Sequence, residues 1–266
     1  MTENKNGKKY QFPDSFILII GHIRVSFRLH YRQTEGIIKA IGKSLPNHPS
    51  YSQICGRVNK LDISAKRSDD NNNNNDDDIV IALDSTGIKE TNRGQWMQQE
   101  KWHIKKKKGY LKIHIAVNIK TNKEILALEV TDKKSHDGKV MPRLIEHVLK
   151  NNEDVKIEST LGDGAYDSNE NFKYLQKKKI KPAIKVRKNS TIVSLKNNRL
   201  RNREVKFQTR DLIKWKKKRR YGQRWIAETA FSSIKRMFGE YVSATKLKNM
   251  VKEMILKVSL YNLFRR

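Results

Sequence analysis

A run of five apolar residues that ends at an acid constrains the fold of this chain more than any other feature. Residues 79–83 read Ile-Val-Ile-Ala-Leu, and Asp84 follows them directly. An uninterrupted run of this kind is typical of a central strand that is buried on both faces, because an exposed face would carry polar residues at alternate positions. Such a strand needs packing layers on both sides of its sheet, so the run indicates an α/β domain.

The elements that follow this run specify a sheet. Alternating apolar residues predict a second strand over 111–117, and a third is predicted over 125–130. A helix with apolar residues at every fourth position then leads to a fourth strand that ends at Asp163. A helix, a fifth strand over 180–186 and two amphipathic helices are expected after it. Pro182 confines the fifth strand to a sheet edge, because proline cannot donate a ladder hydrogen bond.

This order of elements predicts a mixed five-stranded sheet with the strand order 3-2-1-4-5 and helices on both faces. The first three strands can pair as a meander, and the fourth can lie parallel to the first after a helical crossover. Asp84 and Asp163 then stand at the same ends of two neighbouring parallel strands. Two carboxylates so close together repel each other unless a cation lies between them, so the pair indicates a cation site. The alternative is that both aspartates only cap turns or helices.

A polar segment divides the residues before the sheet from the sheet itself. Residues 66–78 read KRSDDNNNNNDDD and are predicted to link a module over 1–65 to a domain over 79–266. Three short helices are expected in the module. The first has an apolar face formed by Phe16, Ile19, Ile20, Ile23 and Phe27, the second is capped by Thr34, and the basic third runs over about 52–61. Such a set suits a helix-turn-helix-like DNA-binding module, and equally a plain helical bundle that packs on the core.

The charge of the chain narrows the class of its partner. Its 57 lysine and arginine residues against 28 aspartate and glutamate residues give a formal net charge of +29. A charge of this size favours nucleic acid as the partner, with an anionic membrane surface second. Residues 201–220 hold ten lysines and arginines against Glu204 and Asp211, a net charge of +8. Within this basic run Lys216, Lys217 and Lys218 are candidate DNA-phosphate contacts, although such a run is usually only a solvated face.

Cysteine content and hydropathy indicate the cellular compartment in which the protein is found. The single cysteine, Cys55, excludes a disulfide framework and a zinc site built from several cysteines. No run of about 18 apolar residues is found, so we expect no membrane span, and the N-terminus shows no secretory signal. We therefore expect a reducing, intracellular setting in the cytoplasm.

The penultimate helix, predicted over about 222–238, carries a charged stripe. At 3.6 residues per turn, Glu228 and Lys235 are rotated by roughly 40° and 20° from Arg224, so the three share one face. Phe231 and Phe238 lie on the same stripe, which therefore faces inward. The simple interpretation is an i,i+4 ion pair between Arg224 and Glu228. A metal ion together with a phosphate would also explain a charged trio on a buried face.

Three segments resemble the DDE transposases of prokaryotic insertion sequences. They are DSTGIK at 84–89, GDGAYDS at 162–168 and YGQRWIAETAFSSIK at 221–235. The last segment matches the Y-(2)-R-(3)-E-(6)-K signature of that group at every spacing. The resemblance implies a ribonuclease-H-like fold in the sheet domain, and it extends over most of residues 14–264.

The resemblance also implies roles for particular residues. Asp84, Asp163 and Glu228 would be the triad that holds two Mg²⁺ or Mn²⁺ ions, which prefer oxygen ligands. The residues that would grip phosphates near the cleavage point are Tyr221, Arg224 and Lys235.

We therefore expect a transposase that cleaves and transfers DNA strands by a two-metal mechanism. Its partners would be the DNA of the element ends and of the target, and joining two ends favours a homodimer on DNA. Two alternatives are a nuclease of the same fold and a non-catalytic DNA-binding protein descended from a transposase. The Tyr-Arg-Glu-Lys signature argues against the first, and the intact triad argues against the second.

Overall fold

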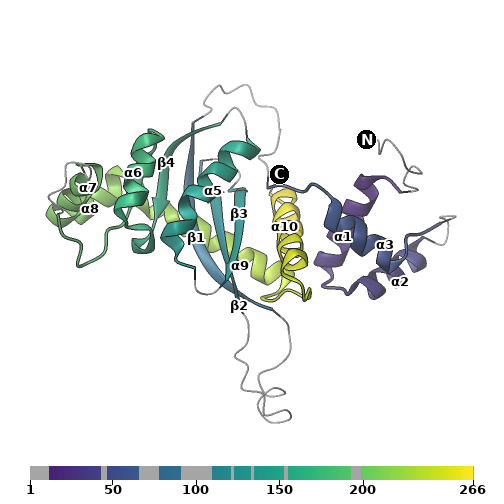
Figure 1. Cartoon of the computed structure of the whole chain (residues 1–266). Coiled ribbons are helices and arrows are strands. Elements are labelled where there is room, and N and C mark those ends of the chain that lie inside the picture. Colours follow the sequence, from purple (N-terminus) through teal and green to yellow (C-terminus); the bar gives the residue numbers. More distant parts are fainter. Residues whose placement is uncertain are drawn as a thin grey trace, which may run out of the picture.

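The centre of the molecule is a five-stranded sheet with helices on both faces (Figure 1). The computed structural model describes residues 12–42, 47–65, 78–90, 110–120, 123–132, 135–152, 155–192 and 199–265. The strand order is β3-β2-β1-β4-β5. The predicted α/β class and the predicted order 3-2-1-4-5 are confirmed, and a mixed sheet of this order between helices is consistent with a ribonuclease-H-like fold. Apart from Asp78, the predicted linker lies outside the described residues.

The sheet combines antiparallel and parallel pairing. Its strands are β1 (Asp78–Lys89), β2 (Tyr110–Asn118), β3 (Ile125–Asp132), β4 (Lys156–Gly162) and β5 (Lys181–Ile184). β1 with β2 and β2 with β3 are antiparallel, whereas β1 with β4 and β4 with β5 are parallel. β5, which contains Pro182, forms one edge as predicted.

β1 is longer than its apolar run. The strand was expected to end at Asp84, but it continues to Lys89, because β2 pairs with it over its whole second half. The parallel pairing with β4 stops earlier, at the pair Ala82 and Leu161. Asp84 therefore lies inside β1, at the level where its neighbour β4 ends.

Two hydrophobic cores account for the apolar run. Ile79, Ile81 and Leu83 pack in the core under α5 (Asp137–Asn151) and α6 (Asn169–Lys177). Val80 and Ala82 point to the opposite face, into the core that includes side chains of α9 (Trp225–Phe238) and α10 (Leu247–Leu263). Because successive side chains of a strand point to opposite faces, a strand between two cores must be apolar at every position.

Two helices lie where the sequence shows only a basic run. They are α7 (Arg199–Arg210) and α8 (Leu212–Lys218), and both precede the predicted penultimate helix. That helix also differs from the prediction, because its first residues form a separate 3-10 helix, η3 (Tyr221–Arg224), before α9 begins at Trp225.

Three N-terminal helices are present, as expected: α1 (Asp14–Ser26), α2 (Tyr31–Ile41) and α3 (Tyr51–Lys60). The prediction that Thr34 caps the second helix is wrong. His30 is the N-cap of α2, and the Thr34 hydroxyl donates back to the His30 carbonyl at 3.0 Å. The predicted apolar face of the first helix is also wrong in part: Ile19 and Phe27 are 54% and 70% exposed. α1 is apolar on most sides, so periodicity alone does not single out the face that is buried.

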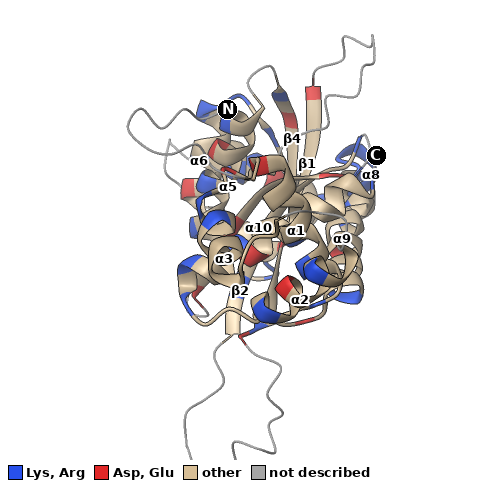
Figure 2. Cartoon of the chain, turned by 90° about the vertical axis from the view of Figure 1, so that its right-hand side faces the viewer, with Lys and Arg blue, Asp and Glu red and all other residues tan. Residues whose placement is uncertain are grey.

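The N-terminal helices pack on the helices of the sheet domain (Figure 2). Ile17 and Ile20 of α1 belong to the same core as Met254 and Leu256 of α10. No helix in the described parts of the chain combines the length and the apolar character that crossing a membrane requires.

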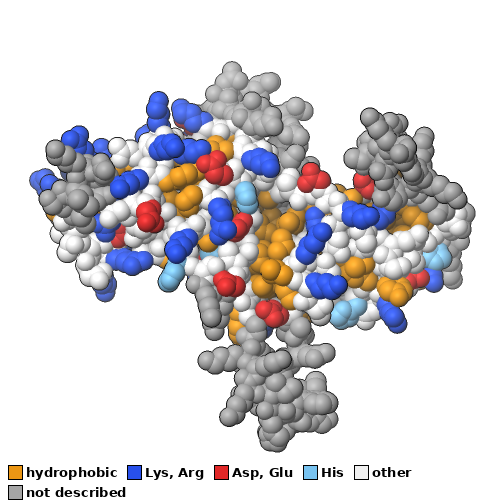
Figure 3. Space-filling model, viewed as in Figure 1, with side chains coloured by type: hydrophobic (Ala, Val, Ile, Leu, Met, Phe, Trp, Pro, Cys, Tyr) orange, Lys and Arg blue, Asp and Glu red, His pale blue; other side chains and the backbone are white. Residues whose placement is uncertain are grey.

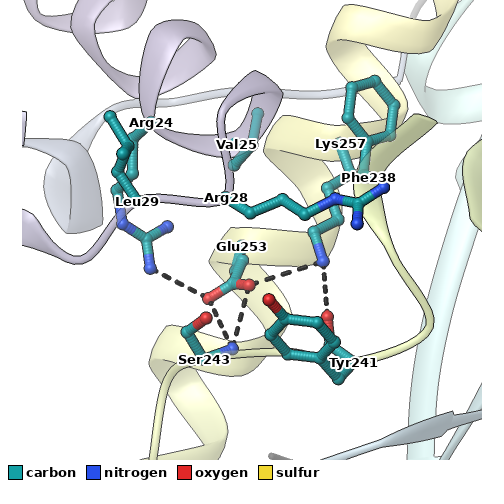
Figure 4. A pocket seen from close by; sticks show the side chains of 9 residues that line it. All are labelled: Arg24, Val25, Arg28, Leu29, Phe238, Tyr241, Ser243, Glu253 and Lys257. Atoms are coloured by element: carbon teal, nitrogen blue, oxygen red, sulfur yellow. Dashed lines mark hydrogen bonds and ion pairs between the residues drawn. The ribbon is translucent and has the colours of Figure 1, made fainter. Parts of the chain in front are cut away.

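Buried charges join α1 to α10 (Figure 4). Arg24 and Glu253 form an ion pair of 3.0 Å in which both side chains are only 5% exposed. The Glu253 carboxylate also accepts from the Ser243 backbone and pairs with Lys257 at 3.4 Å. Arg28, at the end of α1, donates to carbonyl oxygens in the last turn of α9. Because a buried charge is stable only when it is paired and hydrogen-bonded, this junction fixes how α1 sits on α10.

Candidate active site

The two predicted aspartates both lie near the level where β4 ends. Asp84 is inside β1, two residues beyond its last pair with β4. It shares its face of β1 with Thr86 and Ile88, which is the face toward α9. Asp163 directly follows β4 and caps the 3-10 helix η1 (Gly164–Tyr166) by accepting from the Ala165 backbone N–H at 2.9 Å. Asp163 therefore both follows a strand and caps a helix. Its capping role does not exclude a role as a cation ligand.

A tight turn positions Asp163. The ring of Tyr166 packs under Gly162 so closely that a Cβ at position 162 would lie 2.9 Å from the Tyr166 Cδ2 atom. Real Cβ atoms essentially never approach another atom that closely, so a larger residue at 162 would have to displace the buried Tyr166 ring. Glycine therefore lets the turn after β4 pack closely against the core.

Arg224 connects the strand to the helix side of the site. Its guanidinium lies 3.6 Å from the Asp84 carboxylate and forms an i,i+4 ion pair with Glu228 on the first turn of α9. The side chains of Arg224 and Asp84 are 20% and 19% exposed, whereas that of Glu228 is 53% exposed. The pair deduced from helical spacing is therefore present, and Arg224 extends it to a third charged group.

The surroundings of Asp84 favour a positive charge. Burial raises the pKa of Asp84 to about 6, and the negative charges of Glu228 and Asp163 act in the same direction. The Ser85 backbone N–H and Arg224 oppose this rise. Since a raised carboxyl pKa means that the ionised form is poorly stabilised, a further cation at this position would be bound favourably.

Tyr221 and Lys235 lie on either side of Arg224 along the chain. Burial raises the pKa of Tyr221, and the Arg224 guanidinium opposes this rise. Lys235 donates to the Thr86 hydroxyl of β1 at 2.8 Å. The stripe from Arg224 to Lys235 thus runs along β1, with Asp84 beside Arg224 and Thr86 beside Lys235.

The described residues do not form a ready-made metal cage. Among them, no group of three or more histidine, cysteine, aspartate and glutamate side chains is close enough together to hold a metal ion. Asp163 and Glu228 both raise the pKa of Asp84, but Glu228 is held by Arg224. Carboxylate donors of this kind suit Mg²⁺ or Mn²⁺. A metal that used all three would require Glu228 to leave Arg224, which its exposed side chain permits.

The predicted lysines lie on α8, which leads into η3. Lys216, Lys217 and Lys218 are exposed, and Trp215 is the buried side chain of this short helix. In Figure 3, lysine and arginine side chains are spread over the face that it shows, with fewer acidic ones between them. Cationic side chains are therefore not confined to α8.

The structural roles of two acidic residues near the site were not found from the sequence. Asp167, in the same motif as Asp163, is fully engaged by Arg201 at 2.7 Å and by the Arg187 backbone N–H at 3.0 Å. Glu204 is buried beneath Trp215, although the sequence placed it only as a minor charge within the basic run. The one available signal was the tryptophan itself, because an apolar side chain among lysines often marks the buried side of a helix.

The fold and the site together define a class of protein. A mixed sheet with acidic side chains beyond neighbouring parallel strands, faced by a helix with a third carboxylate, is the arrangement of ribonuclease-H-like proteins that process nucleic acids. A family model described as transposase DDE domain matches residues 75–263. A second model with the same description matches residues 1–93, so it includes α1, α2, α3 and β1. The first match covers more than half of the chain, and the chain therefore belongs to the DDE transposase family.

Membership of this family implies a class of substrate. DDE transposases act on DNA and usually use divalent metals, so DNA is the substrate class that the family implies for this chain.

Proposed function

We propose that this transposase cleaves DNA at the ends of an insertion sequence and transfers the strands to a target by a two-metal mechanism. Asp84, Asp163 and Glu228 would hold the ions. The observation that supports this most is the position of Arg224, which bridges a carboxylate of β1 and a carboxylate of α9 beside Asp163. A cationic side chain therefore already contacts two of the three acidic groups.

Each residue of the site would have a distinct role in cleavage. Two Mg²⁺ or Mn²⁺ ions held at this site would supply activation of the attacking oxygen and stabilisation of the leaving oxygen. Asp84 would offer a ligand from within β1 and Asp163 one from the end of β4, and Glu228 would offer a third once it turns away from Arg224. Arg224 is then free to bind the scissile phosphate with its planar donor fork. Tyr221 orients Arg224, and Lys235 supplies a second phosphate contact further along β1.

The remaining surface would bind DNA without reading its sequence. Lys216, Lys217 and Lys218 precede the site along the chain and can lead the phosphate backbone toward it. We propose that residues 1–65 form a DNA-binding module and residues 79–266 the catalytic domain, joined by the segment 66–78. Because two element ends must be joined, the protein would act as a homodimer on DNA, at the nucleoid in the cytoplasm.

The test is a strand-cleavage and joining assay in Mg²⁺, on DNA that carries the inverted repeats flanking the gene. Asp84→Asn, Asp163→Asn and Glu228→Gln should each abolish cleavage and leave DNA binding intact. Glu158→Gln is a matched control, because Glu158 pairs with Lys120 and Lys181 on the surface of β4. Cleavage without joining would favour a nuclease of the same fold. Binding without any cleavage by the wild-type protein would favour a non-catalytic descendant of a transposase.

A further inference from the structure

A buried glutamate anchors the helix pair that precedes the site. Glu204 of α7 is 0% exposed. Its carboxylate accepts a hydrogen bond of 2.7 Å from the Trp215 indole N–H and pairs with the Arg219 guanidinium. Both partners belong to α8 and its C-terminal cap. A carboxylate loses its hydration when it is buried, so this one is stable only while both partners stay in place.

Trp215 connects Glu204 to the next element, η3, through a ring contact. Its ring lies 5.0 Å from the Tyr221 ring, at an interplanar angle of 46°. Tyr221 is the first residue of η3, which contains no buried residue of its own. The turn before it is made by Arg220 in the left-handed region, with φ of 49°. With so little of η3 inside the core, the position of Tyr221 depends on the ring against which it packs.

Tyr221 connects η3 to the carboxylates. It stands three positions before Arg224 and interacts with it electrostatically, and the Arg224 guanidinium in turn contacts Asp84 and Glu228. A series of interactions therefore runs from Glu204 through Trp215, Tyr221 and Arg224 to the carboxylates. The hydrogen bond of Glu204, the ring contact of Trp215 and the ion pairs of Arg224 are direct side-chain contacts.

We propose that Glu204 is a positioning residue of the active site, which acts through Trp215 and Tyr221 to fix the guanidinium of Arg224. The inference rests on the proposed function, because it assigns a role in cleavage. A displacement of about 1 Å in a group that orients the reacting atoms can reduce a rate by about a hundredfold. Loss of the Glu204 anchor should therefore slow cleavage without removing any residue that touches DNA.

The same helix would also link DNA binding to the site. Lys216, Lys217 and Lys218 are exposed on α8, whose one buried side chain is Trp215. DNA held by these lysines would hold the helix against which Tyr221 packs. A variant that alters only the buried side of α8 would nevertheless lower the rate of cleavage and leave the affinity for DNA unchanged.

The test compares two buried residues of the same helix. Glu204→Gln keeps the shape of the side chain and an acceptor for Trp215, but loses the charge that pairs with Arg219. Gln208→Met is the matched control, since Gln208 anchors α7 to β5 by hydrogen bonds with the Ile184 carbonyl at 2.8 Å and the Val186 N–H at 3.0 Å. Single-turnover cleavage at saturating DNA, gel-shift affinity at matched salt and thermal unfolding are measured for each.

Glu204→Gln should slow cleavage about tenfold or more and leave DNA affinity within about twofold of wild type. Gln208→Met should lower the unfolding temperature but leave the rate near normal. In a Tyr221→Phe background, which keeps the ring and removes the hydroxyl, Glu204→Gln should have little further effect on the rate. If Glu204→Gln does not fold, Trp215→Phe should give the same separation of rate from affinity.

Two results would overturn the inference alone. One is an active wild-type protein whose Glu204→Gln variant cleaves at the normal rate. The other is a rate effect that is fully additive with Tyr221→Phe or is matched by Gln208→Met, since a purely structural role would give either result. A wild-type protein that does not cleave in Mg²⁺ would instead overturn the proposed function, and the role of Glu204 with it.

Discussion

Glu228 can be either an ion-pair partner of Arg224 or a metal ligand. The substitution Glu228→Gln separates these two roles, because they predict very different losses of cleavage rate. As a helix partner of Arg224, the half-exposed Glu228 contributes about 0.3–0.5 kcal/mol to stability. Its loss would lower the unfolding temperature by about 1–2 °C in a chain of this size and leave the folded fraction unchanged. Cleavage would then stay close to the wild-type rate.

As a metal ligand, Glu228 would have a much larger effect. Metal ions contribute several kcal/mol to the stabilisation of charge in the transition state, and each 1.36 kcal/mol is about tenfold in rate. Glu228→Gln should therefore slow cleavage about a hundredfold or more, while DNA binding survives because a negative charge has been removed. The assay is single-turnover cleavage in Mg²⁺ beside a gel-shift at the same salt concentration.

The control is Glu146→Gln on α5. Glu146 is 51% exposed and pairs with Lys178, so it matches Glu228 in exposure and in its ion pair but lies away from the site. It should change neither the rate nor the affinity. Cleavage by Glu228→Gln within about twofold of wild type would refute the assignment of Glu228 to the triad.

Three further predictions concern charge and packing. Neutralising the lysines at 216–218 should reduce the dependence of DNA affinity on salt by about one unit of slope per lost phosphate contact, and an unchanged slope in a salt titration would place them away from DNA. Arg24→Met should cost about 3 kcal/mol in chemical unfolding at pH 7. Burial opposes ionisation of Glu253, but Arg24 and Lys257 hold its pKa below the usual value of 4.5. This stabilisation is therefore present above pH 4.5 and lost below it, so the difference from Arg24→Met should shrink as the pH falls through that range. Gly162→Ala should cost about 1–3 kcal/mol and slow cleavage together, because its Cβ displaces Tyr166 and the adjoining turn; a stable, active variant would contradict this.

The sheet was predictable from the sequence because burial leaves a direct pattern in strands. The apolar run before Asp84 identified a strand between two cores, and its alternate residues do pack on opposite faces. The end of the strand was not predictable in the same way. β2 continues to pair with β1 beyond Asp84, and backbone pairing of this kind leaves no hydrophobic signature.

The helices α7 and α8, which precede the site, could not be predicted from hydrophobic periodicity. The sequence of α7 and α8 is dominated by lysine and arginine, and only Val205 and Trp215 are buried apolar side chains there. The polar side chains of Arg201, Glu204 and Gln208 fill the other buried positions of these helices, so no apolar period marks them. Within the site, helical spacing predicted the pair of Arg224 with Glu228. The contact of Arg224 with Asp84 joins residues far apart in the chain and required the structure.

The junction of α1 with α10 has a consequence for biosynthesis. Arg24 and Glu253 are separated by 229 positions, so the first helix of the chain packs against the last. At about 5–20 residues per second, a ribosome needs roughly 10–50 s to make the chain between them. Throughout that time the apolar face of α1 has no partner from α10, and the ends can meet only after the C-terminal helix has left the exit tunnel. Nascent and prematurely terminated chains therefore expose to chaperones and proteases the part of α1 that α10 covers in the folded protein.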